Sequence, residues 1–401
     1  MELKNNRDFK ILRIGQIVHS VSETHKFDKE RLIAINTSDV LNGVLGKGIE
    51  TPIEELKGQF KKTIKNNDLL FSEIRPANRR FAKVGTGNWE NYVISTKLMV
   101  LRKYNYEVDL DYFYYCLTNQ PFLETLQRRA ENRIGSFPQI TFDLLATYAF
   151  PIPPIDEQKR IASTISNIDR KIELNKQIND NLEAMAKQLY DYWFVQFDFP
   201  NEEGKPYKSS GGAMVWNEKL KREIPQGWYS LPISNVLDKY PTTKRYETKE
   251  YLSVGKYPII DQGDSYIVGF TNEDDNLLTR HPAVLFGDHS TKVKFLDFDF
   301  ARGADGTQIL YSSNEAVSQY YLYLSVCALQ IPNPGYSRHF KYLKELPIII
   351  PSLEIAYRFA NIVKPLFEDW TRNIFNNIEL TKQRDELLPL LMNGQASVTL
   401  A

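Results

Sequence analysis

Two long segments of the chain carry apolar residues at alternating steps of four and three, the spacing of a helix that packs along one seam. The first copy extends from Ile161 to Trp193 and the second from Phe359 to Leu391, with each position 198 residues after its counterpart. The seam positions are Ile161, Ile165, Ile168, Ile172, Asn175, Asn179, Leu182, Ala186, Leu189 and Trp193, and then Phe359, Val363, Leu366, Trp370, Asn373, Asn377, Leu380, Arg384, Leu387 and Leu391. The repeat predicts a long helix over residues 154–195 and an equivalent helix in the C-terminal segment.

Both copies interrupt the apolar seam with asparagine at two consecutive positions, Asn175 and Asn179 in the first and Asn373 and Asn377 in the second. If a pseudo-two-fold axis relates the copies, the helices run antiparallel, with Asn175 opposite Asn377 and Asn179 opposite Asn373. Such a polar centre costs stability but fixes register and orientation. The alternative is that each helix packs only on its own half of the chain and exposes its asparagines.

Ahead of each predicted helix lies a module of short strand-like runs and one shorter helix, near Asp111–Arg129 in the first module and Ala316–Leu329 in the second. We therefore predict an α+β fold with two mixed α/β modules separated by two long antiparallel helices. The expected boundaries are a first module at 1–151, a spacer helix at 152–197, a linker rich in glycine, proline and serine at 198–227, a second module at 228–350 and a second spacer helix at 351–401.

Bulk composition fits a soluble globular protein of more than one domain. The chain has 401 residues, of which 42% are apolar and 25% charged. No apolar run approaches the ~18 residues of a membrane span, and no secretory signal precedes the first module, so we expect a cytoplasmic protein that does not enter membranes. Cys116 and Cys327 lie in apolar, tyrosine-rich stretches and are expected to be buried rather than redox-active or metal-binding.

The net charge is zero, so any nucleic-acid role must depend on local patches. Residues 1–150 hold 22 Lys/Arg against 18 Asp/Glu, a net charge of +4. The strongest cluster follows a strand-like run and comprises Ser72, Glu73, Arg75, Asn78, Arg79, Arg80 and Lys83. Arginine can read guanine edges, asparagine adenine edges, and lysine phosphate, so these residues are candidate DNA contacts. A solvated charged loop is the alternative.

The second module offers a comparable polar loop beside a strand-like run, with Gly287, Asp288, His289, Ser290, Lys292 and Lys294. The nearby segment 302–307 suits groove contact and a tight turn equally well. Before each seam helix lie further cations that could contact phosphates: Arg128, Arg129 and Arg133 in the first module, and Arg338 and His339 in the second.

The sequence contains no segment that matches a known catalytic motif in full. Asn333-Pro334-Gly335-Tyr336 differs from the Asn-Pro-Pro-Tyr motif of adenine methyltransferases at its third position, and no strand followed by a glycine-rich loop offers a site for S-adenosylmethionine. The glycines between Gly43 and Gly48 lack the Lys-Ser/Thr of a phosphate-binding loop. No cysteine–histidine cluster has zinc-ligand spacing. We expect no catalytic and no metal-binding residues.

The chain resembles the specificity subunit of type I restriction–modification systems over nearly its whole length. The resemblance is carried by Pro151-Ile152-Pro153-Pro154-Ile155-Asp156-Glu157-Gln158-Lys159-Arg160-Ile161, by Ile172-Glu173-Leu174-Asn175, by the linker from Phe199 to Trp228, and by Leu387-Leu388-Pro389-Leu390-Leu391-Met392-Asn393-Gly394. It implies two target-recognition domains that each read one half of a split, asymmetric sequence of double-stranded DNA.

The resemblance also implies partners. Two methyltransferase subunits would dock on the helices, and motor–nuclease subunits would complete the complex. S-adenosylmethionine and ATP with magnesium would bind to these partners, leaving this chain without a cofactor. The second helix carries Ile355 and Ala356 where the first has Glu157 and Gln158, which makes docking of the second methyltransferase the weaker expectation.

Two other functions stay open from the residues alone. One is a scaffold whose modules bind protein rather than DNA, which the cluster from Arg75 to Lys83 would distinguish, because a scaffold does not need those cations. The other is a self-contained methyltransferase, which would have to bind S-adenosylmethionine by itself.

Overall fold

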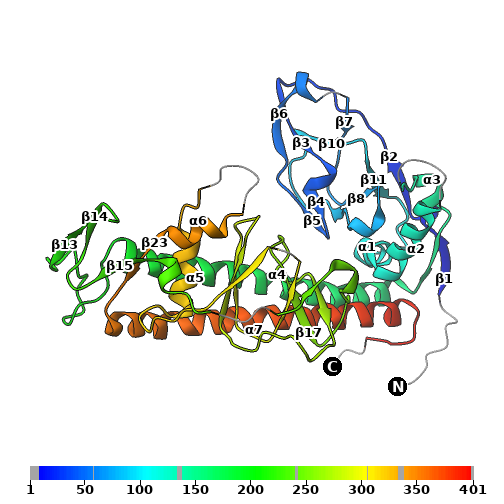
Figure 1. Cartoon of the computed structure of the whole chain (residues 1–401). Coiled ribbons are helices and arrows are strands. Elements are labelled where there is room, and N and C mark those ends of the chain that lie inside the picture. Colours follow the sequence, from blue (N-terminus) through cyan, green and yellow to red (C-terminus); the bar gives the residue numbers. More distant parts are fainter. Residues whose placement is uncertain are drawn as a thin grey trace. The chain divides into compact units, whose positions relative to one another are not determined.

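The computed structural model describes residues 9–56, 58–132, 138–239, 243–304, 306–332 and 338–398. The chain divides into two compact units, Met1–Glu173 with Ile378–Ala401, and Leu174–Asn377. In sequence, the first long helix, α4 (Ile155–Tyr190), and the second, α7 (Leu353–Met392), each contribute to both units (Figure 1). Along the described chain, no helix combines the length and apolarity that crossing a membrane requires.

The first unit combines short strands with three short helices. Its strands are β1 (Lys10–Arg13), β2 (Val18–Val21), β3 (Arg31–Ile35), β4 (Val40–Leu41), β5 (Val44–Leu45), β6 (Ile49–Pro52), β7 (Phe60–Lys62), β8 (Leu69–Ser72), β9 (Phe81–Lys83), β10 (Tyr92–Ser95), β11 (Leu98–Lys103) and β12 (Ala149–Ile152). Its short helices are α1 (Leu110–Thr118), α2 (Gln120–Glu131) and α3 (Phe142–Leu145).

Two four-stranded sheets form the body of this unit, in the orders β6-β3-β10-β7 and β2-β11-β8-β9. All four residues of β8 are buried, as expected for a strand covered on both faces. Phe71 of β8 and Tyr112 of α1 belong to one core with Ile161 and Ile165 of α4. The module is thus anchored to the beginning of the long helix by side chains that the heptad spacing singled out.

The second unit has the strands β13 (Met214–Asn217), β14 (Arg222–Pro225), β15 (Tyr229–Pro232), β16 (Arg245–Tyr246), β17 (Tyr257–Ile260), β18 (Gly269–Thr271), β19 (Ala283–Gly287), β20 (Val293–Leu296), β21 (Ala301–Gly303), β22 (Thr307–Leu310) and β23 (Pro347–Ile350). Its short helices are α5 (Gln319–Ala328) and α6 (Phe340–Glu345). The sheets follow the orders β16-β21-β17-β18 and β20-β19-β22.

Several pairings of the first unit recur in the second. Strand β1 pairs antiparallel with β12, which leads into α4, and β15 pairs antiparallel with β23, which leads into α7. Strand β8 lies between β9 and β11, and β19 lies between β20 and β22, again antiparallel on both sides. Strand β19, like β8, is buried at every residue.

Three sequence expectations need correction. The helix expected over Asp111–Arg129 is two helices, because Asn119 is extended (φ −65°, ψ 148°) and caps α2 through its side chain. The long helix ends at Tyr190 and continues as a single wider turn over Asp191–Val195. The segment 198–227, expected to be a linker, has structure of its own, since it contains the hairpin β13–β14, and Phe199 stacks on Trp228 with ring centroids 5.0 Å apart.

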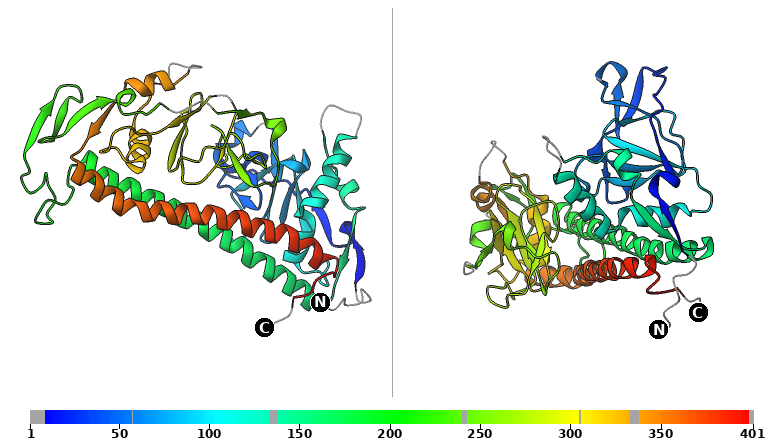
Figure 2. Two further views of the ribbon diagram at one scale, coloured as in Figure 1. Left: turned by 60° about the horizontal axis from the view of Figure 1, so that its bottom comes forward. Right: turned by 90° about the vertical axis from the view of Figure 1, so that its right-hand side faces the viewer.

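Within the second unit, α4 and α7 run side by side and antiparallel (Figure 2). Asn175 Nδ2 donates to Asn377 Oδ1 at 2.8 Å, and Asn373 Nδ2 donates to Asn179 Oδ1 at 2.9 Å. These are the two pairs that the antiparallel seam predicts. Asn175 and Asn179 are each 8% exposed, so both sit inside the seam rather than on its surface.

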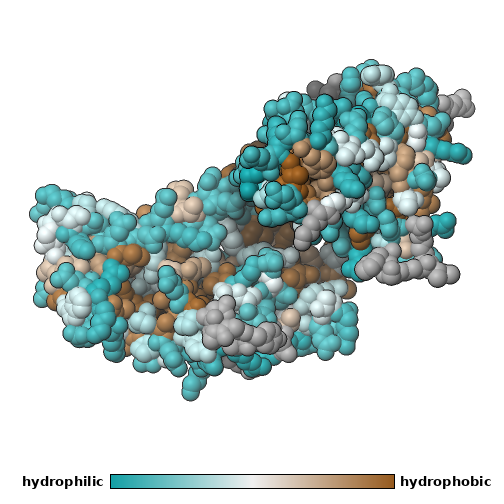
Figure 3. Space-filling view, turned by 90° about the horizontal axis from the view of Figure 1, so that it is seen from above, coloured by the Kyte–Doolittle hydropathy of each residue, from teal (hydrophilic) through white to brown (hydrophobic). Residues whose placement is uncertain are grey.

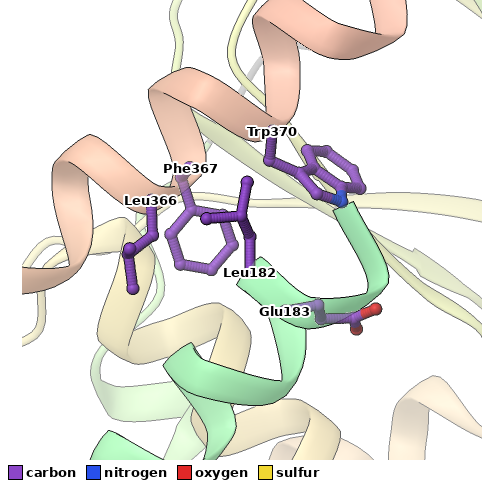
Figure 4. A pocket seen from close by; sticks show the side chains of 5 residues that line it. All are labelled: Leu182, Glu183, Leu366, Phe367 and Trp370. Carbon is purple, nitrogen blue, oxygen red and sulfur yellow. The ribbon is translucent and has the colours of Figure 1, made fainter. Parts of the chain in front are cut away.

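Further along the seam of the second unit, Leu182 lies beside Phe367, on the side that faces Trp370 (Figure 4). Glu183 points away from them, and its carboxylate accepts a hydrogen bond from the Tyr323 hydroxyl at 3.0 Å. The hollow among these side chains and Trp370 has a volume of ≈ 0 Å³ for a water-sized molecule. It is a packed seam and not a ligand site.

The first unit contains the other end of the seam. Leu388 and Leu391 of α7 join Ile161 and Ile165 of α4 in one core. At the seam position where the second copy has arginine, Arg384 donates to Asp169 of α4 at 2.8 Å. Burial opposes the charge, but hydrogen bonding to this carboxylate raises the pKa of Arg384 above its usual value.

Candidate nucleic-acid interface

The predicted first-module cluster forms the connection between the antiparallel strands β8 and β9. The connection is tightly wound, with a single 3₁₀ turn over Pro76–Asn78. Arg75 and Arg79, on either side of this turn, both adopt left-handed backbone conformations, with φ of 46° and 54°. Such conformations cost of order 1–3 kcal/mol each for residues other than glycine and cluster at functional sites.

Two residues of this connection present their side chains to solvent. Arg75 and Asn78 are exposed, and neither side chain has a hydrogen-bond partner among the described residues. Their chemistry suits a guanine edge and an adenine edge, respectively. Of the predicted cluster, these two are the residues that the structure leaves available for a ligand.

Three other cations of the cluster are already engaged within the protein. Arg79 donates to the side chains of Asn42 at 2.9 Å and Gln120 at 2.6 Å, and burial lowers its pKa below the usual value, with nearby Arg384 as a second cause. Arg80 donates to the carbonyls of Ser38 at 2.8 Å and Val40 at 3.3 Å.

Lys83 pairs with Asp111, in the first turn of α1. This ammonium and the guanidiniums of Arg79 and Arg80 therefore contribute to the architecture of the module, and a direct role for them in DNA contact is not supported by this conformation. Ser72 is 3% exposed, and its hydroxyl accepts from the amide of Ile74 at 3.1 Å. Glu73 accepts a hydrogen bond from the Gln139 side chain at 2.8 Å.

The second-module cluster forms the turn between β19 and β20. His289 is exposed, and its backbone amide donates to the Gln262 side chain at 2.9 Å. The Ser290 hydroxyl donates to the backbone carbonyl of the same glutamine at 2.7 Å. A Cβ on Gly287 would lie 2.9 Å from Gln262 Cβ and 2.2 Å from the Ser290 hydroxyl, so only glycine fits where these segments meet.

Sequence reasoning missed Gln262, which organises this turn from a distant loop. The only signal was the polar run that contains it, Asp261–Asp264, which follows an apolar strand. Lys292 at the turn pairs with Asp264 of the same run. The turn is therefore fixed by contacts to residues about thirty positions earlier in the chain.

Three residues that the sequence predicted as DNA contacts in the second module are instead buried. Lys294 is 6% exposed and donates to the carbonyls of Asp261 at 2.8 Å and Ser265 at 2.6 Å, and burial lowers its pKa. Asp288 is 3% exposed and accepts from the Phe340 amide at 2.8 Å, which caps the beginning of α6. His339 is 3% exposed, with Nδ1 3.0 Å from the Asp288 carbonyl. These side chains hold the fold together and cannot reach a ligand in this conformation.

The remaining basic candidates divide between exposed residues and residues outside the described ranges. Arg128 and Arg129 in the last turn of α2 are exposed, as is Arg338 before α6. Arg133, Asp305 of the segment 302–307, and the tetrapeptide 333–336 lie outside the described residues.

Within the described ranges, no three His, Cys, Asp or Glu side chains are grouped as a metal site.

The expectation of unequal docking depended partly on Gln158, which the second helix replaces by Ala356. Gln158 is 1% exposed, and its side chain accepts from the Asp109 amide at 2.7 Å and donates to the Pro153 carbonyl at 2.8 Å. The equivalent Ala356 is 6% exposed. Because both residues face the interior, this replacement alters internal packing rather than a docking surface.

Comparison with known proteins identifies the family. The family model of the type I restriction modification DNA specificity domain matches residues 4–184 and 225–380, which is most of the chain. The chain belongs to this family. Specificity subunits are the non-catalytic members of type I restriction–modification systems, and their role is to confer DNA sequence specificity.

Individual specificity subunits are similar over most or all of their length. The HindI specificity subunit of Haemophilus influenzae is 28% identical, over 97% of this chain and 99% of its own. The MjaIX specificity subunit of Methanocaldococcus jannaschii is 26% identical, over 72% of this chain and 69% of its own. The type I restriction–modification S subunit of M. genitalium superposes with a TM-score of 0.53 at 18% identity, over 100% of this chain and 99% of that one, which supports a shared fold.

Proposed function

We propose that this specificity subunit reads a bipartite, asymmetric sequence in double-stranded DNA, with the modules 1–151 and 228–350 each reading one half. The observation that carries the proposal is the recurrence of pairings between the units. In both, an antiparallel strand pair leads into a long seam helix, and a buried strand ends in a polar turn. We take this recurrence as a pseudo-two-fold repeat whose modules differ in what they bind.

The paired helices would act as the spacer. Helix α4 has 36 residues, and at a rise of ~1.5 Å per residue it is ~54 Å long, which corresponds to ~16 base pairs of duplex at ~3.4 Å each. A seam fixed by two asparagine pairs would keep this length and register constant while the modules diverge. A spacer of constant length would hold the modules at the positions of two separated half-sites on one duplex.

The partners follow from the family. We expect two methyltransferase subunits to dock on the helices and motor–nuclease subunits to join the complex. S-adenosylmethionine, ATP and magnesium would bind to those partners. This chain would supply sequence recognition, in the cytoplasm, while base flipping and methyl transfer occur on the partner.

The test is to coexpress the chain with its methyltransferase in a host that lacks other DNA methylation, and to sequence the modified motif. We expect a motif in two parts. The double variant Arg75→Ala, Asn78→Ala should relax one half-site, at a cost of roughly 1–3 kcal/mol of discrimination, and leave the other unchanged. Arg13→Ala, an exposed arginine on β1 of the same unit, is the matched control.

Two outcomes contradict the proposal. If both half-sites change together, the modules do not read DNA independently. If the assembled complex shows no sequence preference, the chain is a protein-binding scaffold. Binding of S-adenosylmethionine to the isolated chain, measured by calorimetry, tests the remaining alternative of a self-contained methyltransferase, and we expect none.

A further inference from the structure

The strands β4 and β5 form a small hairpin in the first unit with an unusual outer face. Leu41 and Val44 are directly paired across it, on either side of Asn42 and Gly43. Despite being aliphatic, their side chains are 50% and 59% exposed. The inner pair of the same hairpin is Val40 and Leu45, of which Val40 is fully buried in the core. The hairpin thus places Val40 in the core with Leu45 partly buried against it, and a second apolar pair in solvent.

The tip of this hairpin is held rigidly against the loop between β8 and β9. The Asn42 amide donates to the Arg79 carbonyl at 2.7 Å, and the Gly43 amide donates to the Phe81 carbonyl at 2.9 Å. Asn42 and Gly43 both have positive φ, 45° and 90°, as the tight Asn-Gly turn of a two-residue hairpin requires. A Cβ on Gly43 would lie 2.8 Å from the Tyr114 hydroxyl, so the turn has no room to shift towards α1.

Two of the arginines that the sequence predicted as DNA contacts, Arg79 and Arg80, hold this hairpin in place. Arg79 Nε donates to the Asn42 side chain at 2.9 Å, and Arg80 donates to the carbonyls of Val40 on β4 and of Ser38 in the turn before it. Both guanidiniums are thus positioning groups for the hairpin. The β8–β9 connection that holds the hairpin tip also carries the exposed Arg75 and Asn78, whose side chains suit nucleic acid.

We propose that the Leu41–Val44 face of this hairpin is a base-reading element that enters the major groove and contacts the methyl group of thymine. The major groove admits a two-stranded β-ribbon, and thymine is the base that presents a methyl group there. The exposed cation Arg75, on the connection to which the hairpin tip is bonded, supplies the positive charge that an apolar ribbon lacks and that favours approach to DNA. This inference rests on the proposed function, because it assigns a residue-level role within the half-site that the first module reads.

The test uses the assembled complex with its methyltransferase and a randomised duplex library, from which bound sequences are recovered. Leu41→Ser with Val44→Ser removes the apolar face and, unlike threonine, leaves no methyl group that could contact thymine. We expect preference for an A·T pair at one or two adjacent positions to fall about tenfold, with the rest of the motif retained. Ile11→Ser, at an exposed aliphatic position (68%) on β1 of the same unit, is the matched control and should leave the motif unchanged.

A second arm isolates the methyl group. Deoxyuridine replaces thymine at the affected position, which deletes only that methyl, and wild-type affinity should fall several-fold while the affinity of the double variant does not change. Thermal unfolding of the variants verifies that the hairpin is intact. An unchanged motif, or a uniform loss of affinity for every sequence, would refute the role of the hairpin even where the wild-type complex reads a bipartite site. A wild-type complex that selects no motif refutes the proposed function itself.

Discussion

The register of the helical seam predicts which pair of introduced cysteines an oxidant will capture. Two variants differ in a single position: Asn175→Cys with Asn377→Cys, and Asn175→Cys with Asn373→Cys. In the structure the Asn175 and Asn377 side chains meet at 2.8 Å, whereas Asn373 meets Asn179 instead. We expect rapid capture of the first pair and little of the second.

The magnitude follows from helix geometry. Residues 373 and 377 lie four positions apart on α7, which at ~1.5 Å per residue displaces them by ~6 Å along the axis. A disulfide tolerates Cα separations only up to ~6.8 Å. Because that displacement is added to a separation already set by helix packing, the mismatched pair cannot close without moving a helix. We therefore expect capture at least about tenfold slower.

The assay is oxidation followed by electrophoresis without reductant. A bond between 175 and 377 closes a loop spanning 202 residues and changes the mobility of the denatured chain. The native thiols serve as an internal control, since Cys116 is fully buried and each single-cysteine variant reports any pairing with them. Equal or faster capture of the 175–373 pair would refute the antiparallel register inferred here.

Three further predictions concern stability. Asp288→Ala removes the acceptor of the Phe340 amide, so α6 should lose about 1 kcal/mol of protection and its first amides should exchange faster by hydrogen exchange mass spectrometry, with no change expected in α2. Arg384→Met deletes a hydrogen bond to Asp169 from a side chain only 16% exposed, so urea unfolding should show a loss of roughly 1–3 kcal/mol, and a loss of zero would mean that the pair is fully solvated. Burial raises the pKa of Cys327 to about 12, whereas the pKa of an unfolded cysteine is ~8.5. The stability that this thiol contributes is therefore complete below about pH 8.5 and is lost as the pH rises towards 12. Cys327→Ala should reduce the fall in the free energy of unfolding over this pH range.

The first-module cluster shows why the candidate site could be predicted only in part. Composition located the basic stretch after a strand-like run, and the structure places it between β8 and β9. Whether each cation faces solvent depended on acceptors far away in sequence: Arg79 on Asn42, and Lys83 on Asp111. Because those acceptors are brought close by strand pairing, no local pattern around residues 75–83 distinguishes the exposed Arg75 from its engaged neighbours.

The same limit applied to the buried polar residues of the second module. Lys294 reads as a surface cation in the sequence, yet backbone carbonyls of a separate loop satisfy its ammonium in the interior. A buried charge is tolerated only with such partners, and they are supplied by the tertiary fold. The view from above in Figure 3 shows the hydrophilic side chains that cover much of the visible surface, in keeping with the 25% of charged residues.

The sequence by itself determined the seam. Heptad spacing is a local property, and two copies with the same period and the same asparagine positions leave one antiparallel register that pairs each seam asparagine with another asparagine. Tertiary structure decided what the modules present to a ligand. Strand order, the stacking of Phe199 on Trp228, and the hydrogen bond from Arg79 to Asn42 all arise from contacts between residues distant in sequence. Such contacts depend on how whole sheets pack, and the period of a single segment carries no record of them.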